Sequence, residues 1–227
     1  MKIGVLLSGC GVYDGAEIHE AVLALLAIEE SGADPVCIGV DKNQHHVVNH
    51  MSGEEMNETR NMMVEASRIA RGEITDINNV DPADIDGLVI PGGFGSAKNF
   101  TSWAFDGPEG RVLPEVKLLL VNLVNVGKPI AALCVSPVVL AKAFEDSEIE
   151  PFMTIGSDQE ESPYDIKGFS DGITATGAKT TMKKANEINI DRTNKIVTAP
   201  CYMMDTNLVT LRKNIADAVS ALKELID

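Results

Sequence analysis

Long hydrophobic runs are missing from this chain of 227 residues. The longest runs, such as residues 21–28 and 129–133, are far shorter than the ~20 apolar residues that a membrane-spanning helix needs. The first eight residues carry one positive charge and too short an apolar run for a signal peptide. We therefore expect a cytoplasmic protein with no membrane contact.

Positive charge is also scarce, because 19 Lys and Arg residues stand against 34 Asp and Glu residues, for a net charge of −15. Such a chain repels phosphate backbones and anionic lipid headgroups, so nucleic acid is not an expected partner. The four cysteines are far apart and form no C-x-x-C pair, which predicts neither a zinc site nor a disulfide framework. We expect no bound metal.

Short β-branched runs alternate with longer helical patterns, which predicts parallel strands joined by helical crossovers. The length suffices for one substantial core, so we expect a single domain over residues 1–227. The fold class predicted is α/β, a flavodoxin-like three-layer α/β/α sandwich with a mostly parallel sheet. The expected strands cover residues 2–8, 36–40, 87–90, 129–133 and 196–199, with short strands at 152–155, 173–175 and 188–190.

Helices are predicted between these strands. Asp14 and Glu17 have the D-x-x-E spacing of a capping box, and apolar residues then recur at helical intervals up to residue 28. Further helices are expected over residues 61–70, 114–126, 137–144 and 208–226. Residues 41–61 are polar and without period, which indicates a surface excursion.

Cys134 lies where a buried strand stops and a helix begins, with small residues two positions to either side. This pattern is typical of a nucleophile elbow, a strained turn that projects a nucleophile outward. The following helix adds a positive N-terminal field that favours thiolate. The alternative is that Cys134 is a small core residue, since free cysteine is often buried.

Gly92 and Gly93 end another predicted strand, and ligand sites of open α/β sheets lie at that edge. The amide of Gly93 is a candidate partner of the Val135 amide in an oxyanion hole; a simple tight turn is the alternative. Glu17, His19 and Glu20 follow the first strand and reach the same edge. A buried carboxyl group there would act as proton donor and acceptor for the thiol. The residues alone do not separate Glu20 from His19, and Glu17 already has a capping role.

Several other functions are disfavoured. All four histidines precede Cys134, so the downstream H-x-E pair of a glutamine amidotransferase is absent. Gly9-x-Gly11 after a strand suggests a dinucleotide site, but Asp14 occupies the place of the third glycine. His46 and His50 have the spacing of two metal ligands on a helix, although their polar setting favours a solvated loop.

Three segments closely resemble the ElbB ("enhancing lycopene biosynthesis") family: SGCGVYDGAEIHE at 8–20, VIPGGFGSAKN at 89–99 and NKIVTAP at 194–200. This family belongs to the PfpI-like, class I glutamine amidotransferase-like superfamily, which also contains the Parkinson-associated deglycase. The resemblance implies that Cys134 is the nucleophile and that Glu20 is the active-site acid, because residues 15–20 align with the segment that ends in the superfamily glutamate.

The resemblance implies a cofactor-free glyoxalase, a lyase that turns glyoxal into glycolate through a cysteine hemithioacetal and has deglycase activity in addition. Glu20 would move the protons, while the Gly93 and Val135 amides would hold the oxyanion. The substrate is then a small aldehyde, the metabolic setting is isoprenoid biosynthesis, and family habit favours a homodimer.

Two departures from the superfamily limit this reading. Val135 replaces the histidine that follows the cysteine in PfpI proteases, so peptidase activity is not expected. The third active-site histidine of the deglycase would fall near Ile155, so we expect slow turnover, with Glu20 and His19 left to tune the thiol. Cys10 either borders the pocket or is a small turn residue. The alternative functions are a cysteine-based redox sensor or regulatory protein without catalysis, and a nucleotide-binding module.

Overall fold

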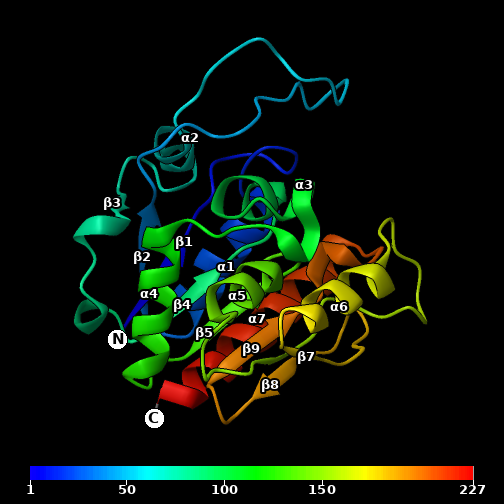
Figure 1. Ribbon diagram of the computed structural model, residues 1–227. Coiled ribbons are helices and arrows are strands. Elements are labelled where there is room, and N and C mark those ends of the chain that lie inside the picture. The colour runs from blue at the N-terminus through cyan, green and yellow to red at the C-terminus, as the bar shows by residue number, and fades with distance from the viewer. Residues whose placement is uncertain (227) are drawn as a thin grey trace.

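The computed structural model describes residues 1–226 and is built on a seven-stranded sheet in the order β3-β2-β1-β4-β5-β9-β8 (Figure 1). All strands run parallel except β8, which pairs antiparallel with β9. A separate parallel pair, β6 and β7, lies outside this sheet. The strands are β1 (Lys2–Leu6), β2 (Asp34–Gly39), β3 (Thr75–Asp76), β4 (Gly87–Ile90), β5 (Ile130–Leu133), β6 (Phe152–Met153), β7 (Lys179–Thr180), β8 (Asn189–Asp191) and β9 (Ile196–Ala199).

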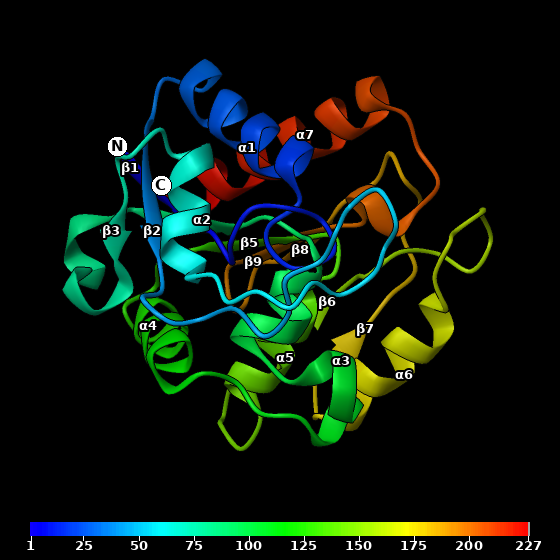
Figure 2. The same ribbon diagram turned by 90° about the horizontal axis from the view of Figure 1, so that it is seen from above.

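Helices cover both faces of the sheet, as the view from above shows (Figure 2). On one face α1 (Ile18–Glu30) packs against α7 (Leu208–Ile226), with α2 (Met62–Ile69) beside α1. On the other face α4 (Pro114–Asn125) and α5 (Pro137–Phe144) pack on β5, and the short α3 (Trp103–Asp106) and α6 (Ile166–Ala175) lie farther along that side. The flavodoxin-like α/β/α sandwich predicted from the sequence is confirmed.

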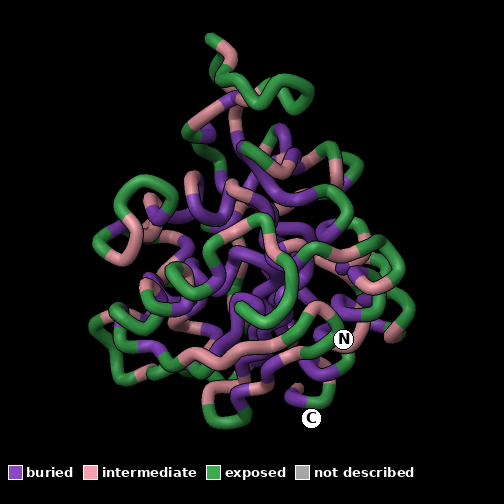
Figure 3. Tube along the Cα trace, turned by 90° about the vertical axis from the view of Figure 1, so that its right-hand side faces the viewer, coloured by how far each residue is buried: buried purple, intermediate pink, exposed green. Residues whose placement is uncertain are grey.

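The core lies in the middle of the sheet. Every residue of β4, β5 and β9 is buried, because helices cover these strands on both faces. Their sequences, GLVI, IAAL and IVTA, are continuously apolar apart from one threonine. Figure 3 shows this buried centre and, by contrast, a largely exposed excursion that projects from one end. The central strands therefore form a rigid support for whatever their carboxyl ends carry.

In the segment after α5, one strand prediction is wrong and another strand is shorter than predicted. Residues 173–175 are the last turn of helix α6, in which Asp165 caps the helix by accepting from the Gly168 N–H at 2.9 Å. Ile166 and Ile173, seven residues apart, are buried on one face of this helix. The strand was predicted because the two β-branched residues at 173 and 174 favour a strand when they are considered without the rest of the fold. The strand expected at 152–155 ends at Met153, because the Thr154 amide donates to the Thr198 side chain instead of a strand backbone.

The excursion between β2 and α2 contains His46 and His50 in a loop and not on a helix. It is held at its base by the Val48 N–H, which donates to the buried carboxylate of Asp14 at 2.7 Å. Across residues 1–226 we find no group of three or more His, Cys, Asp or Glu side chains arranged to hold a metal ion. None of the described helices has the length and apolarity to cross a membrane.

Candidate active site

The carboxyl ends of neighbouring strands bring the predicted site residues to one edge of the sheet. Cys134 directly follows β5, Gly92 and Gly93 follow β4, and Glu20 lies in the first turn of α1, the helix after β1. The strand order reverses between β1 and β4, because the chain passes from β1 to β2 on one side and continues at β4 on the other. Ligand sites of open α/β sheets lie at such a reversal.

Cys134 adopts the strained turn that the sequence predicts. Its φ of 56° is in the left-handed region, which residues with a side chain rarely occupy. Its N–H donates to the Ala199 carbonyl at 2.9 Å, which ties the turn to the neighbouring strand β9. The following backbone turns at once into α5, since the Val138 N–H donates to the Val135 carbonyl at 3.1 Å. Cys134 as a whole is only 6% exposed, so its thiol is almost entirely shielded from solvent.

The backbone of Gly92 lies close to both Cys134 and the carboxyl group of Glu20. A Cβ atom placed on Gly92 would lie 2.3 Å from the Cys134 Cβ and 2.5 Å from the Glu20 Oε2. Any side chain at Gly92 would therefore push these two groups apart. The sequence indicated the Gly-Gly pair as a special backbone position but did not assign this packing role to Gly92.

The carboxyl group of Glu20 is fully buried and lies beside the thiol of Cys134, since both groups crowd the backbone of Gly92. Its Oε2 accepts from the Gly92 N–H at 2.8 Å and its Oε1 accepts from the Tyr202 N–H at 3.2 Å. Burial, followed by the negative charge of Glu17, raises the pKa of Glu20 to about 8. Glu20 is therefore mostly protonated at neutral pH and can donate its proton to the sulfur.

The thiol of Cys134 is not a resting thiolate, which corrects the expectation from the elbow motif. Burial, and next the charge of the Glu20 carboxylate, raise the pKa of Cys134 well above its ordinary value. The amides of Gly93 and Val135 donate to the sulfur and act in the opposite direction. The structure thus pairs a thiol and a carboxylic acid whose titrations are coupled, so that the loss of one proton leaves a single negative charge shared between them.

A small cavity lies beside the sulfur, with about 20 Å³ of free space. The rings of Phe94, Tyr164, Phe169 and Tyr202 surround it, and Phe94 contacts Tyr164 edge-to-face with centroids 5.9 Å apart. This volume accommodates one or two water molecules, at roughly 10–15 Å³ each. A larger molecule reaches the sulfur only when some of these rings move.

His19 and Cys10, the two further residues proposed for the pocket, do not line this cavity. The His19 side chain is 55% exposed and lies at the rim, with Nδ1 3.1 Å from the Tyr202 hydroxyl. Cys10 is half-buried on the side of α2, where burial and then the charge of Glu65 raise the pKa of its thiol. Between the two α1 candidates that the residues left open, Glu20 is the group that contacts the thiol.

Cys201 is a residue of this site that the sequence reasoning missed, and Glu17 was considered there but set aside as a capping residue. Glu17, and not Asp14, caps α1, and its side chain also lines the cavity. Cys201 follows β9, is fully buried and has a left-handed φ of 47° beside the backbone of Cys134. The signal for Cys201 was its place after a buried strand in Ala199-Pro200-Cys201, at the same sheet edge as Cys134.

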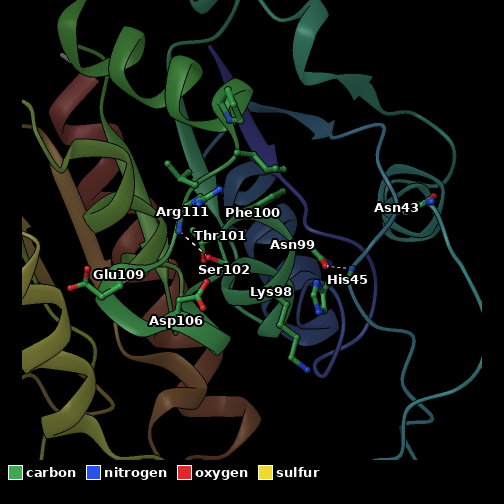
Figure 4. A pocket seen from close by; sticks show the side chains of 13 residues that line it. Asn43, His45, Lys98, Asn99, Phe100, Thr101, Ser102, Asp106, Glu109 and Arg111 are labelled. Carbon is green, nitrogen blue, oxygen red and sulfur yellow. Dashed lines mark hydrogen bonds between the residues drawn. The ribbon is translucent and has the colours of Figure 1, made fainter.

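A larger hollow of about 860 Å³ lies between the excursion and the segment from Lys98 to Pro114 (Figure 4). There the Asn99 side chain accepts from the His45 N–H at 2.8 Å, and the exposed carboxylates of Asp106 and Glu109 face solvent. This hollow shares no lining residue with the Cys134 cavity and contains no thiol. The smaller cavity is the better candidate, because chemistry requires the nucleophile and its acid more than it requires volume.

The chain is similar to known proteins in both sequence and structure. Residues 10–144 match the model of the DJ-1/PfpI family. The chain is 40% identical to the Homo sapiens protein named glutamine amidotransferase-like class 1 domain-containing protein 3, mitochondrial, across 99% of this chain and 83% of that protein. The chain therefore belongs to the DJ-1/PfpI family, and its fold is of the class I glutamine amidotransferase-like type.

Two further relatives agree with this assignment. The ES1 protein homolog, mitochondrial, of Rattus norvegicus is 39% identical across 99% of this chain and 84% of its own length. A solved structure from Ehrlichia chaffeensis, described as an isoprenoid biosynthesis protein with an amidotransferase-like domain, is 34% identical. It superimposes with a TM-score of 0.90 over 100% of both chains. The human and rat relatives are named as mitochondrial proteins.

Proposed function

We propose that this protein is an ElbB-type, cofactor-independent glyoxalase that converts glyoxal to glycolate through a hemithioacetal on Cys134. The observation that carries the proposal is the buried pair of Cys134 and Glu20, which lie side by side at the sheet edge and whose titrations are coupled. DJ-1/PfpI relatives include glyoxalases and deglycases, and deglycase activity is part of the proposal.

The proposed reaction begins with ionisation of the pair. The pair first loses one proton to solvent, which leaves the remaining proton on Glu20 and the negative charge on the sulfur. The sulfur then attacks one aldehyde carbon of glyoxal, forming a C–S bond while the carbonyl oxygen becomes an oxyanion. The amides of Gly93 and Val135 hold the sulfur before attack. Once the charge has passed from sulfur to oxygen, the same two donors are available to the oxyanion.

The second half of the reaction moves one proton and adds one water. The hydrogen on the sulfur-bearing carbon is removed as a proton, and the other carbon receives a proton, which gives a hydroxyacetyl thioester on Cys134. Water then attacks the thioester carbonyl, the C–S bond breaks, and glycolate and the free thiol result. The net change is glyoxal plus water to glycolate, with no external oxidant or reductant.

The test compares glycolate formation from glyoxal by the wild type, Cys134→Ser and Cys37→Ser. Cys37 is a buried thiol of β2 outside the cavity, so its variant is the matched control and should keep the wild-type rate. The Cys134→Ser variant should lose activity. Equal rates for wild type and Cys134→Ser would remove the proposed function.

The closed cavity favours a second candidate, in which Cys134 is a redox sensor or regulatory thiol, because a peroxide is small enough to reach the sulfur without motion of the rings. Mass spectrometry after mild peroxide treatment tests this role, and failure of Cys134 to oxidise ahead of the other three thiols would contradict it.

The proposal includes four further points: a cytoplasmic location, a homodimer, a single domain over residues 1–227 and a link to isoprenoid biosynthesis. The similarity to the Ehrlichia protein supports the link to isoprenoid biosynthesis.

A further inference from the structure

Glu20 is badly placed to move a proton between the two carbons of a bound substrate. Its side chain is 0% exposed and does not line the cavity. Both of its oxygens already accept backbone hydrogen bonds, from Gly92 and from Tyr202, and it also contacts the thiol. Reaching a substrate carbon would require Glu20 to give up contacts that hold Cys134 in place.

Glu17 is the carboxyl group that faces the substrate space. It lines the same cavity as Cys134, and its side chain is 11% exposed. Its Oε2 accepts from the Glu20 N–H at 2.7 Å, as the cap of α1, while His19 Nδ1 lies 3.8 Å from Oε1. One oxygen of Glu17 thus fixes the side chain while the other is free to take a proton.

The backbone also fixes Glu17 next to the nucleophile. The Glu17 N–H donates to the Gly92 carbonyl at 2.9 Å, and a Cβ atom on Gly93 would lie 2.4 Å from the Glu17 nitrogen. The segment that presents the Gly93 amide to the sulfur is therefore packed directly against Glu17. The start of α1 and the end of β4 form one rigid unit around the reacting atoms.

We propose that Glu17 is the acid–base residue that carries the proton from one carbon of the hemithioacetal to the other, while Glu20 serves only the thiol. This inference rests on the proposed function. Oε1 of Glu17 removes the proton from the sulfur-bearing carbon, and the electron pair forms the C=C bond of an enediol while the neighbouring aldehyde oxygen takes up a proton. Glu17 then returns its proton to the second carbon as the hydroxyl on the sulfur-bearing carbon loses its proton and becomes the thioester carbonyl, so the oxygens gain and lose one proton in total.

The surroundings of Glu17 suit a proton carrier. Burial raises the pKa of Glu17, and the Glu20 N–H and the charge of His19 oppose that rise. A carboxyl group with a raised pKa is a stronger base as carboxylate, which favours abstraction from carbon. The titratable groups that face Glu17 are Glu20 and His19 on α1, and Cys134, Tyr164 and Tyr202 around the cavity. His19 at the rim also provides a route for proton exchange with water.

The experiment separates bond formation at sulfur from turnover in Glu17→Gln. The Gln side-chain oxygen can still accept from the Glu20 N–H, so the cap persists, but the side chain no longer takes a proton. We expect glyoxal to protect Cys134 from iodoacetamide as it does in wild type, while glycolate formation falls by about 100-fold or more. A Glu17→Gln rate within about threefold of wild type would overturn the inference, since general acid–base catalysis contributes far more.

Two further measurements keep the test decisive. Glu17→Ser retains a capping oxygen without a carboxyl group, so it should show the same split even where the Gln variant folds poorly. Wild-type turnover in D2O should place deuterium on the glycolate carbon, because a proton held on Glu17 exchanges with water before it is returned, whereas a hydride shift would place none there. Absence of wild-type activity, or full activity in Cys134→Ser, would instead refute the proposed function and this inference with it.

Discussion

Burial of the Glu20 carboxyl group makes the stability of this protein depend on pH in a defined window. The pKa of Glu20 rises from 4.5 to about 8 in the folded state, so the folded protein binds this proton more tightly than the unfolded chain does. The stabilisation is fully present below pH 4.5 and is lost as pH rises through about 8. At 1.36 kcal/mol per pKa unit, the loss of stability amounts to roughly 4–5 kcal/mol. This is a large share of the free energy of unfolding of a typical protein, which is about 5–15 kcal/mol.

The assay is urea unfolding of the wild type and Glu20→Gln at a series of pH values from 5 to 9. Gln carries no titratable proton, so the difference between the two proteins isolates Glu20 from the other acidic residues. The Gln side chain places an NH2 group where one carboxyl oxygen accepted a backbone hydrogen bond. The Glu20→Gln variant should therefore be less stable than wild type at pH 5 by roughly 1–3 kcal/mol. Because only the wild type loses the Glu20 contribution as pH rises, the Glu20→Gln variant should be the more stable of the two proteins at pH 9.

The control is Glu29→Gln, which changes an exposed glutamate of the same helix and should leave the slope with pH unchanged. A difference between wild type and Glu20→Gln that stays constant within about 0.5 kcal/mol from pH 5 to 9 would refute the reasoning, because additive background effects have about that size. It would mean that Glu20 does not hold a proton in the folded state at neutral pH.

Three other measurements test the same site. Iodoacetamide labelling of Cys134 should still accelerate between pH 8 and 9, because its pKa is raised well above the ordinary value; a plateau below pH 8 would contradict this. Gly92→Ala should destabilise the protein by roughly 2–4 kcal/mol through overpacking against Cys134, whereas Gly53→Ala, in an open loop position, should cost about 1 kcal/mol; thermal unfolding compares the two. Tyr164→Ala should open the cavity and speed labelling of Cys134 at fixed pH, and an unchanged rate would show that the ring does not limit access.

The fold could be predicted from the sequence because its signals are local. Apolar runs such as residues 87–90 and 130–133 are buried on both faces, and each ends where a glycine pair or Cys134 follows. The segment at 173–175 failed for the same reason: two β-branched residues suggest a strand, while the burial of Ile166 and Ile173 on one helix face depends on packing against the rest of the molecule.

The site was predictable in its members and not in its electrostatics. The elbow at Cys134 and the acid at Glu20 follow from strand ends and from the resemblance to a family. Their pKa values depend on how completely the surrounding chain excludes water, and that is a tertiary property. Glu17 was set aside because its spacing explained a cap, and only the folded arrangement gives the same side chain a second role.

The ring of four aromatic side chains over Cys134 has a consequence for selectivity. Most enzymes select substrates by contacts that form inside the open active site. Here a molecule larger than the cavity must first displace the aromatic side chains before it reaches the sulfur. Bulky thiols and disulfides would have to displace these rings, so we expect Cys134 to form mixed disulfides slowly. For a substrate larger than this cavity, we expect the movement of the rings to contribute to the rate at which the protein can act.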